Sequence, residues 1–480
     1  MELSWRSFWN TFNDNKRINQ LNKLSGIRES INWIPKNVSV LGAARSGIAV
    51  IKYLVKNGIT PFLSDICSGE KIETILKSQG LMNVNYESNG HTQEIFTAEL
   101  IICSPGIPSD IPVLKEARKR GIPVWSEVEF AYRQSTAPFL AVTGSTGKST
   151  TVSLLGSIFN EADKEHVVAG NIGLPLISVA PDISKNGYVV AEISSFQLEN
   201  IDIFRPRVAA ILNLMENHLD RYENEEDYYN AKKSIINAMD KSDILVVNAH
   251  DNALSSWAEQ IKNSVRIVYF GKDIQDSDCV WYESSQMISK FNNKTEHVLD
   301  LDQMRVRGRH NFDNACAAAA IAISSGIDKN SIHRGLINFR GLPHRLEFVK
   351  EVHHVKYYND SKATTAESVE CAVNAFESNV HLIAGGKDKG CNFSLIRNSI
   401  RKKIKSICLL GEAADRIFRE WQGIENISRV ETLEMALDVI GKNVAEGDVV
   451  LLSPGCSSFD MFTSYEERGD IFKELVYNLK

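Results

Sequence analysis

Ala141-Val-Thr-Gly-Ser-Thr-Gly-Lys-Ser-Thr150 is the stretch that decides the fold. It follows an apolar run from Phe139 and leads into a helical pattern that begins at Val152. Glycines allow a backbone to fold closely around a phosphate group, and a helix N-terminus directs N–H groups toward it. The full phosphate-loop pattern has a further glycine where this chain has Val142, so the loop is the shorter GxxGK[ST] form. The stretch predicts a phosphate-binding turn between a strand and a helix; the alternative is a glycine-rich turn with a chance lysine.

The composition of the chain restricts its class of partner. The 480 residues carry a formal net charge of -6, which argues against a nucleic-acid partner, because phosphate backbones require a clustered basic face. The eight cysteines are scattered without a CxxC pair, as expected for reduced thiols in the cytoplasm. The apolar run 315–323 is too short to cross a bilayer. We expect a cytoplasmic protein without membrane insertion or nucleic-acid binding, acting as a monomer.

Apolar β-branched runs followed by glycine and then by amphipathic stretches recur along the chain. This alternation is typical of βα units, so we expect an α/β protein with parallel sheets. The length indicates about three domains. The expected division is a helical N-terminal extension at 1–36 and three domains at 37–136, 137–341 and 342–480.

Two polar residues follow apolar runs after the phosphate loop, and two adjacent lysines lie in a later helical stretch. Glu192 ends an apolar run, and a carboxylate there, beside a phosphate loop, suits a Mg²⁺ ligand. His218 lies just past the next apolar run, where sites of α/β proteins assemble. Lys232 and Lys233 lie in a helical stretch, and spacing alone does not separate them. The alternatives are a surface carboxylate, a structural histidine and a solvated lysine.

The first expected domain begins with a second glycine turn. Val40-Leu-Gly-Ala-Ala-Arg-Ser-Gly47 departs from the G-x-G-x-x-G pattern because Ala44 replaces the middle glycine. Asp65 ends the following strand, 23 residues after Gly42, where an acidic side chain can meet a nucleoside. This region predicts a nucleotide site, and an NAD site is a competing interpretation.

Several motifs together carry a family resemblance. In chain order they are Gly144-Ser-Thr-Gly-Lys-Ser-Thr150, Gly170-Asn-Ile-Gly-Leu-Pro, Glu192-Ile-Ser-Ser-Phe-Gln-Leu-Glu, Asn213…His218-Leu-Asp-Arg and Tyr228-x-x-Ala-Lys232. The chain resembles the Mur ligases over about 37–480, and among them most of all the members that add D-glutamate. The resemblance implies a Rossmann-like N-terminal domain, a central phosphate-loop ATPase domain and a Rossmann-like C-terminal domain that binds the amino acid.

The resemblance also implies an activity. It is the ATP-dependent joining of D-glutamate to UDP-N-acetylmuramoyl-L-alanine through an acyl phosphate, during peptidoglycan precursor synthesis in the cytoplasm. The implied cofactors are ATP and two Mg²⁺ ions. Lys232 matches the family lysine that becomes carbamylated, and a carbamate anion can orient Mg²⁺ where an ammonium would repel it. The implied catalytic residues are Lys148, Glu192, His218 and Lys232. The implied metal ligands are Ser149, Glu192, His218 and carbamylated Lys232.

The resemblance assigns the remaining motif residues to three ligands. The implied ATP contacts are Gly144, Ser145, Thr146, Gly147, Lys148, Ser149, Thr150, Asn311, Asn314, Arg345, Asp360 and Lys362. The implied contacts to the UDP-sugar are Arg45, Ser46, Gly47, Asp65, Ser104, Asn171 and Ser194. The implied D-glutamate contacts are Thr364, Lys389, Ser458 and Tyr465. In the run Lys387-Asp388-Lys389, Lys387 is an alternative to Lys389 as the lysine that contacts D-glutamate. For Asn311 and Asn314, the alternative to an ATP contact is a structural role as an N-cap and a polar helix face.

Two other functions remain open. The first is a sister ligase of the same family, or a folylpolyglutamate-type synthetase, with a different amino acid. The second is a catalytically inactive protein that binds a nucleotide sugar. Retention of Lys148, Glu192, His218 and Lys232 together weighs against the second.

Overall fold

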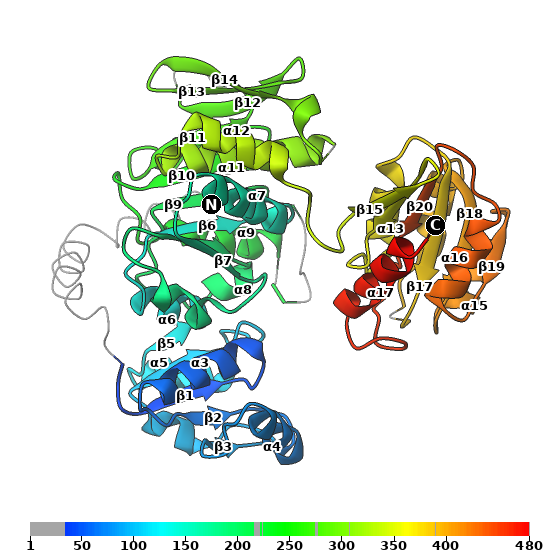
Figure 1. Ribbon diagram of the computed structural model, residues 1–480. Helices are drawn as coiled ribbons and strands as arrows, with labels where there is room; N and C mark the ends of the chain where they lie inside the picture. The colour runs from blue at the N-terminus through cyan, green and yellow to red at the C-terminus, as the bar shows by residue number, and fades with distance from the viewer. Residues whose placement is uncertain are drawn as a thin grey trace, which may run out of the picture. The chain divides into compact units, whose positions relative to one another are not determined.

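A computed structural model describes residues 34–215, 221–222, 224–273, 277–306, 308–388 and 390–479 (Figure 1). The helical extension expected at 1–36 therefore lies almost entirely outside the described residues. The chain forms two compact units, one ending at Asn338 and the other containing Phe339–Lys480, with residues 305–308 belonging to the second. Within the described ranges, every helix is too short or too polar to cross a lipid bilayer.

The first unit begins with a parallel sheet of five strands among the described residues, in the order β3-β2-β1-β4-β5. This order matches the first five strands of the Rossmann order 3-2-1-4-5-6, a fold in which ligands bind outside the carboxyl ends of the strands. The strands are β1 (Val38–Leu41), β2 (Phe62–Ser64), β3 (Asn85–Glu87), β4 (Leu100–Cys103) and β5 (Val124–Ser126). The accompanying helices are α3 (Arg45–Lys56), α4 (Gly69–Ser78), η2 (Gln93–Thr97), α5 (Pro112–Lys119) and α6 (Glu127–Arg133).

A second sheet in the same unit runs in the order β14-β13-β12-β11-β10-β9-β6-β8-β7 within the described residues. The strands are β6 (Phe139–Thr143), β7 (His166–Gly170), β8 (Tyr188–Glu192), β9 (Val208–Ile211), β10 (Ile244–Asn248), β11 (Arg266–Gly271), β12 (Cys279–Glu283), β13 (Gln286–Phe291) and β14 (Lys294–Asp300). The helices are α7 (Lys148–Glu161), η3 (Leu176–Ser178), η4 (Ala180–Asp182), α8 (Ser195–Leu198), α9 (Glu225–Lys233), η5 (Ser234–Ile236), α10 (Asn252–Ile261), η6 (Leu301–Gln303), α11 (Arg309–Ser324) and α12 (Lys329–Asn338).

Small residues let two helices pack closely in this unit. The alanine-rich part of α11, 315–320, is completely buried, and α11 contacts α7 and β11. On α12, a Cβ added to Gly335 would lie 2.4 Å from the Cα of Ile158 on α7, so only glycine fits there. The tight helix packing expected for the alanine run is therefore present. Because one hydrophobic core extends from Val38 to Trp281, both sheets of the unit share it.

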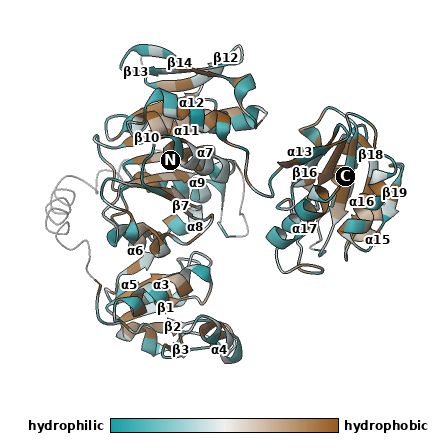
Figure 2. Ribbon diagram, viewed as in Figure 1, coloured by the Kyte–Doolittle hydropathy of each residue, from teal (hydrophilic) through white to brown (hydrophobic). Residues whose placement is uncertain are grey.

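The second unit contains a sheet in the order β15-β16-β20-β17-β18-β19 in its described part. The strands are β15 (Glu347–Val352), β16 (Val355–Asn359), β17 (Val380–Gly385), β18 (Ile404–Leu410), β19 (Ile427–Arg429) and β20 (Val449–Leu452). The helices are α13 (Ala366–Asn374), η7 (Phe393–Leu395), α14 (Arg397–Ile400), α15 (Ala414–Glu420), α16 (Leu433–Gly441) and α17 (Tyr465–Tyr477). Figure 2 shows hydrophobic strands within this unit, and two separate apolar clusters contain their side chains. Two clusters are expected for a sheet covered on both faces.

The expected α/β fold class with three sheet-based domains is confirmed. The expectation of parallel sheets needs one correction. The hairpins that β12, β13 and β14 form are antiparallel, and β15 pairs antiparallel with β16. Their turns contain residues with positive φ, such as Ser284, Asn292 and His353, which suit short hairpin connections. The domain boundaries at 136/137 and 341/342 stay a prediction.

Candidate active site

The phosphate loop connects β6 to α7 and depends on two glycines with positive φ. Gly144 has φ +147° and Gly147 has φ +82°, and α7 begins at Lys148. A Cβ added to Gly147 would lie 2.3 Å from Asn314 Oδ1, so a side chain there would displace the loop. The Lys148 Nζ donates to the carbonyls of Gly144 at 2.8 Å and Ser145 at 3.1 Å. The loop has the shape and polarity for a phosphate at the N-terminus of α7.

Side chains after β9 fix the tip of the loop. Asn213 Oδ1 accepts from the Thr146 N–H at 2.9 Å. The Ser145 hydroxyl donates to the Met215 carbonyl at 2.9 Å, and the Met215 N–H donates to Ser145 Oγ at 2.9 Å. The Tyr228 hydroxyl on α9 donates to Ser145 Oγ at 3.2 Å. The hydroxyl expected to contact ATP is thus hydrogen-bonded within the protein, and it holds the loop in place.

Glu192 lies at the carboxyl end of β8, next to β6. It pairs in register with Val142 on one side and Gly170 on the other, and it is 2% exposed. Its Oε1 accepts from Asn171 Nδ2 at 2.7 Å, whereas its Oε2 is buried without a hydrogen-bond partner among the described residues. An unsatisfied buried carboxylate oxygen is unfavourable unless a cation or donor meets it. Ser149 lies in the first turn of α7, so the donor types at this edge fit a Mg²⁺ ion.

The structure distinguishes the two neighbouring lysines of α9. Lys232 is 1% exposed, and its Nζ donates to the Gly144 carbonyl at 3.0 Å and lies 4.4 Å from the centre of the Tyr228 ring. Burial, together with the charge of Lys148, lowers the pKa of Lys232 to about 7. Lys233 instead lies partly exposed near the Trp257 ring, with its Nζ 5.5 Å from the ring centre. Lys232 is therefore the lysine at the phosphate loop.

Other expected ATP residues of this unit lie on α7 and α11. Thr150 is buried in the first turn of α7. Asn314 is buried on α11, and its Oδ1 accepts from the Thr151 hydroxyl at 3.5 Å. Asn311 lies one turn earlier on α11 and is partly exposed. Asn314 thus contacts the phosphate loop region, while His218 lies outside the described residues.

A cavity of about 960 Å³ lies in the first unit, at the carboxyl ends of the strands of the five-stranded sheet. Its walls include the turn after β1, the loop after β4 and the residues that follow β7. Five of the residues expected to contact the UDP-sugar line it, namely Arg45, Ser46, Asp65, Ser104 and Asn171. A cavity of this size, at this edge of a Rossmann-like sheet, suits a nucleotide-sized ligand.

Two residues expected at this site have a supporting position instead. A Cβ added to Gly47 would lie 1.9 Å from the carbonyl oxygen of Gly42, so this glycine allows α3 to approach the turn. Ser194 precedes α8, and its N–H and hydroxyl both donate to Gln197 Oε1, at 3.0 and 3.1 Å. Gln197 itself lines the cavity. Neither Gly47 nor Ser194 belongs to the cavity wall.

Asp65 lines the cavity and also shapes the turn beside it. Its two carboxylate oxygens accept from the N–H groups of Ala43 at 2.6 Å and Cys67 at 2.8 Å. Burial acts to raise the pKa of Asp65, but these hydrogen bonds outweigh it, so the pKa is lowered. A charged Asp65 therefore holds the glycine turn after β1 in place.

The second unit brings its expected site residues to the carboxyl edge of its own sheet. Asp360 follows β16 and accepts from the Ser453 hydroxyl at 2.8 Å and the Leu346 N–H at 3.1 Å. Burial raises the pKa of Asp360 to about 7. Lys362 lies 5.5 Å from the centre of the Tyr465 ring. These contacts join the segments after β16 and β20 to the start of α17.

The remaining expected residues of this unit differ in exposure. Arg345 is exposed, Thr364 is partly exposed, and Ser458 is buried in the loop after β20. Lys387 is hydrogen-bonded through its N–H to the Ser457 carbonyl at 2.8 Å, which joins the loop after β17 to the loop carrying Ser458. Lys389 lies outside the described residues.

Several residues that organise these sites were not predicted from the sequence. Asn213 and Gln197 lie within motifs quoted for the family resemblance, so their positions in those motifs could have indicated a role in the site. Arg468 on α17 had no such signal: it is 2% exposed and donates to Ser361 Oγ at 2.9 Å and to the carbonyls of Ser361 at 2.7 Å and Cys456 at 3.1 Å. Its contacts span 12 and 107 residues of sequence, which no local pattern reveals.

Three family models match successive parts of the chain. Residues 36–126 match the Mur ligase MurD-like N-terminal domain, 142–322 the Mur ligase middle domain, and 344–456 the glutamate ligase domain of Mur ligases. Solved structures at low identity agree on the fold. The UDP-N-acetylmuramate–alanine ligase of Thermotoga maritima is 19% identical with a TM-score of 0.55, covering 92% of this chain and 100% of that one.

Curated relatives match nearly the whole chain. The UDP-N-acetylmuramoylalanine–D-glutamate ligase of Acidobacterium capsulatum is 39% identical over 444 residues, covering 92% of this chain and 96% of the relative. The enzyme of the same name from Clostridioides difficile is 37% identical over 449 residues, covering 93% of this chain and 99% of the relative. Matches of this length and identity, together with the three domain models, show that the chain belongs to the Mur ligase family.

Proposed function

We propose that this protein joins D-glutamate to UDP-N-acetylmuramoyl-L-alanine with cleavage of ATP, in the cytoplasmic synthesis of peptidoglycan precursors. The names of the near-full-length relatives support this substrate pair. The position of Asn171 carries the proposal structurally. Asn171 lines the large cavity and also donates to Glu192 at the edge of the phosphate loop, so a ligand in the cavity would extend toward the loop.

The proposed reaction has two steps. The free alanine carboxylate of the UDP-sugar attacks the γ-phosphorus of ATP, which breaks the bond to the β-phosphate oxygen and yields an acyl phosphate and ADP. The D-glutamate amine then attacks the acyl carbon, loses a proton, and expels inorganic phosphate to leave an amide. Lys148 and the loop N–H groups would stabilise the charge on the transferring phosphoryl group, with positioning as the main contribution of the protein.

The residues at the loop fit bound Mg²⁺, for which we propose two ions. Ser149, Glu192, His218 and a modified Lys232 would hold them. Glu192 Oε2, which has no hydrogen-bond partner in the described part of the chain, supports this assignment. When bound, Mg²⁺ would neutralise the negative charge of the triphosphate.

Carbamylation of Lys232 belongs to the same proposal. The reaction is addition of CO₂ to the neutral amine, which gives a carbamate anion and releases one proton. A pKa of about 7 leaves a large share of the amine neutral near pH 7, as this addition requires. Lys148 and Lys232 donate to the same Gly144 carbonyl, so the modification would replace a like-charge neighbour by an attractive one.

The second unit would supply the amino acid site. A dicarboxylic amino acid requires several fixed donors, and we propose Lys389, Thr364, Ser458 and Tyr465 for this role. Arg345, Asp360 and Lys362 would act on the nucleotide, together with Asn311 and Asn314 of the first unit.

The test is phosphate release from ATP in the presence of UDP-N-acetylmuramoyl-L-alanine, with D-glutamate, L-glutamate or no amino acid. We expect release that requires D-glutamate and a product heavier by one glutamyl residue in mass spectrometry. Release with another amino acid would make the protein a sister ligase, and absence of release in all three mixtures would contradict the proposal.

A further inference from the structure

The loop 104–111, which follows β4, forms one wall of the large cavity, and α8 contributes to another. Residues 104–108 and Ile111 line the cavity from the loop, and Gln197 lines it from α8. The loop belongs to the domain of the five-stranded sheet, whereas α8 follows β8 of the second sheet. The separation of these two walls therefore depends on what joins the loop to α8.

An ion pair between Arg221 and Glu199 makes this connection. Glu199 is the C-cap residue of α8, and its two carboxylate oxygens accept from Arg221 Nε at 3.1 Å and Nη2 at 2.7 Å. The two side chains are only 11% and 10% exposed. The Arg221 guanidinium also lies 4.3 Å from the centre of the Phe196 ring on α8. This bidentate arrangement fixes the direction of both side chains.

The same pair holds the loop on either side of Pro108. Arg221 Nη2 donates to the Ile107 carbonyl at 3.0 Å, and the Ser109 N–H donates to Glu199 Oε2 at 3.3 Å. Because proline has no N–H, the backbone groups of its neighbours are the ones that can fix this part of the loop. Ile107 and Pro108 both line the cavity, so the pair holds the loop at the point where it forms the wall.

The burial of the pair favours a role in positioning over a role in stability. A buried ion pair loses the hydration of both charges, so its net contribution to stability is small, while its geometry fixes one arrangement of the groups around it. Arg118 on α5 gives the loop a second attachment, from Nη1 to the Ser109 carbonyl at 2.7 Å and from Nη2 to Asn200 Oδ1 at 2.6 Å. Without Arg221 the loop would stay attached at Ser109 but would no longer be held at Ile107.

We propose that Arg221 and Glu199 are positioning residues for the nucleotide-sugar, because their ion pair sets the separation of two cavity walls. The inference rests on the proposed function of the cavity and deepens it. The described lining of the cavity includes neither side chain, so they would act through Ile107 and Pro108 and not by contact with the ligand. Loss of the pair would misplace the wall and weaken binding of the nucleotide-sugar, with little effect on ATP.

Calorimetric titration of the full chain with UDP-N-acetylmuramoyl-L-alanine tests this inference. Arg221→Met should raise the Kd about tenfold, with the KM for ATP within about twofold of the wild-type value. Because this variant leaves Glu199 buried without its cationic partner, its Tm should also fall. The double variant Arg221→Met/Glu199→Gln has no unpaired charge, so its Tm should recover in part. Its Kd should stay raised, because the Ile107 carbonyl still lacks its donor.

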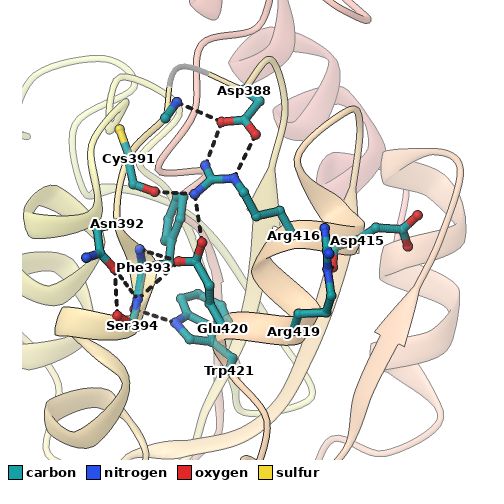
Figure 3. Close-up of polar contacts among 11 residues, drawn as sticks. Asp388, Cys391, Asn392, Phe393, Ser394, Asp415, Arg416, Arg419, Glu420 and Trp421 are labelled. Atoms are coloured by element: carbon teal, nitrogen blue, oxygen red, sulfur yellow. Dashed lines mark hydrogen bonds and ion pairs between the residues drawn. The ribbon is translucent and has the colours of Figure 1, made fainter.

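Arg416 in the second unit provides a matched control, because it forms the same kind of ion pair (Figure 3). It donates to both carboxylate oxygens of Asp388, at 2.7 and 2.5 Å, and to the Cys391 carbonyl at 2.5 Å. Arg416→Met therefore removes a comparable ion pair and a comparable bond to a loop carbonyl. It should leave the Kd for the nucleotide-sugar unchanged.

Two results would overturn the inference. The first is an unchanged Kd in Arg221→Met. The second is a double variant whose Kd returns to the wild-type value together with its Tm, which would show that the pair affects only the stability of the fold. If the unmodified chain does not bind the nucleotide-sugar at all, the proposed function fails before any variant is made.

Discussion

The phosphate loop of the first unit and the loop 385–394 of the second unit handle positive charge in opposite ways. At the phosphate loop, the amines of Lys148 and Lys232 donate to the same neutral carbonyl, and Lys232 is buried. In the second unit, Lys387 and Arg416 each bind a carboxylate, with a quarter to a half of their side chains exposed. In the first region the two amines lie close together at one carbonyl, and in the second region each cation lies beside a carboxylate.

This difference in the surroundings of the cations indicates different roles: the lysines of the phosphate loop take part in the reaction, and the ion pairs of the second unit hold a loop in place. Burying an amine beside another cation is unfavourable, and such an arrangement persists at sites where ligand binding or modification uses it. A partly exposed ion pair contributes little to stability, so the pairs of the second unit are better explained by the order they impose on the loop. Four predictions test this contrast, from the largest expected effect to the smallest.

The largest effect should come from Lys148→Ala. Lys148 opens α7 and bonds within the phosphate loop, so its removal takes away charge stabilisation of the transferring phosphoryl group. We expect kcat for phosphate release to fall by about 10³-fold. Lys164→Ala, which changes an exposed lysine just beyond α7, should keep kcat within about twofold. Equal kcat values for the two variants would contradict a role for Lys148 in phosphoryl transfer.

The next effect should distinguish the adjacent lysines of α9. Lys232→Ala should lower kcat by about 10²-fold or more, because the substitution removes the amine that donates to the Gly144 carbonyl. Lys233→Ala should lower it by less than about threefold, since that side chain lies by Trp257. Steady-state rates at saturating substrates decide between them, and a larger loss in Lys233→Ala would show that the wrong lysine was chosen.

Substitution of Lys232 should raise the stability of the fold while it lowers activity. Burial lowers its folded pKa to about 7, so the unfolded chain binds more protons between pH 7 and the ordinary pKa of 10.5, and wild-type stability rises with pH in that window. Lys232→Met removes the buried amine. In CO₂-depleted buffer we expect Tm to rise by about 2–4 °C at pH 7, and the gain to shrink toward pH 10. A lower Tm than wild type at pH 7 would show that Lys232 stabilises the fold.

The smallest effect concerns Glu127, a buried carboxyl of the first unit whose Oε1 accepts from the Ile177 N–H at 2.7 Å. Burial raises its pKa to about 7, so the folded chain binds more protons above pH 4.5 and stability is lost as pH rises toward 7. Glu127→Gln should raise Tm at pH 7 by about 1–2 °C with kcat unchanged. The comparison is Asp360→Asn, whose carboxyl has a similar pKa but lies in a proposed nucleotide segment, and which should lower kcat. Equal kcat values in both variants would contradict that role for Asp360.

Local sequence was sufficient to predict some of the site and not the rest. The phosphate loop and Glu192 could be predicted because a strand, a turn and a helix are consecutive in sequence. The link from the cavity to the loop through Asn171 depends on a contact across 21 residues, and the Arg416–Asp388 pair on one across 28. Such pairs arise when parallel strands bring their following loops to one edge, and neither residue type nor spacing marks them. Spacing did not separate Lys232 from Lys233; the family resemblance selected Lys232, and the burial of that side chain agrees with the choice.

The most direct test of the charge contrast is ¹³C NMR of the full chain in buffer containing ¹³C-bicarbonate, recorded for the wild type, Lys232→Ala and Lys233→Ala. A buried amine that is partly neutral at pH 7 should add CO₂. We expect a carbamate resonance in the wild type that disappears in Lys232→Ala and remains in Lys233→Ala. A wild-type spectrum identical to that of Lys232→Ala would contradict it, because the positive charge at the phosphate loop would then remain unmodified.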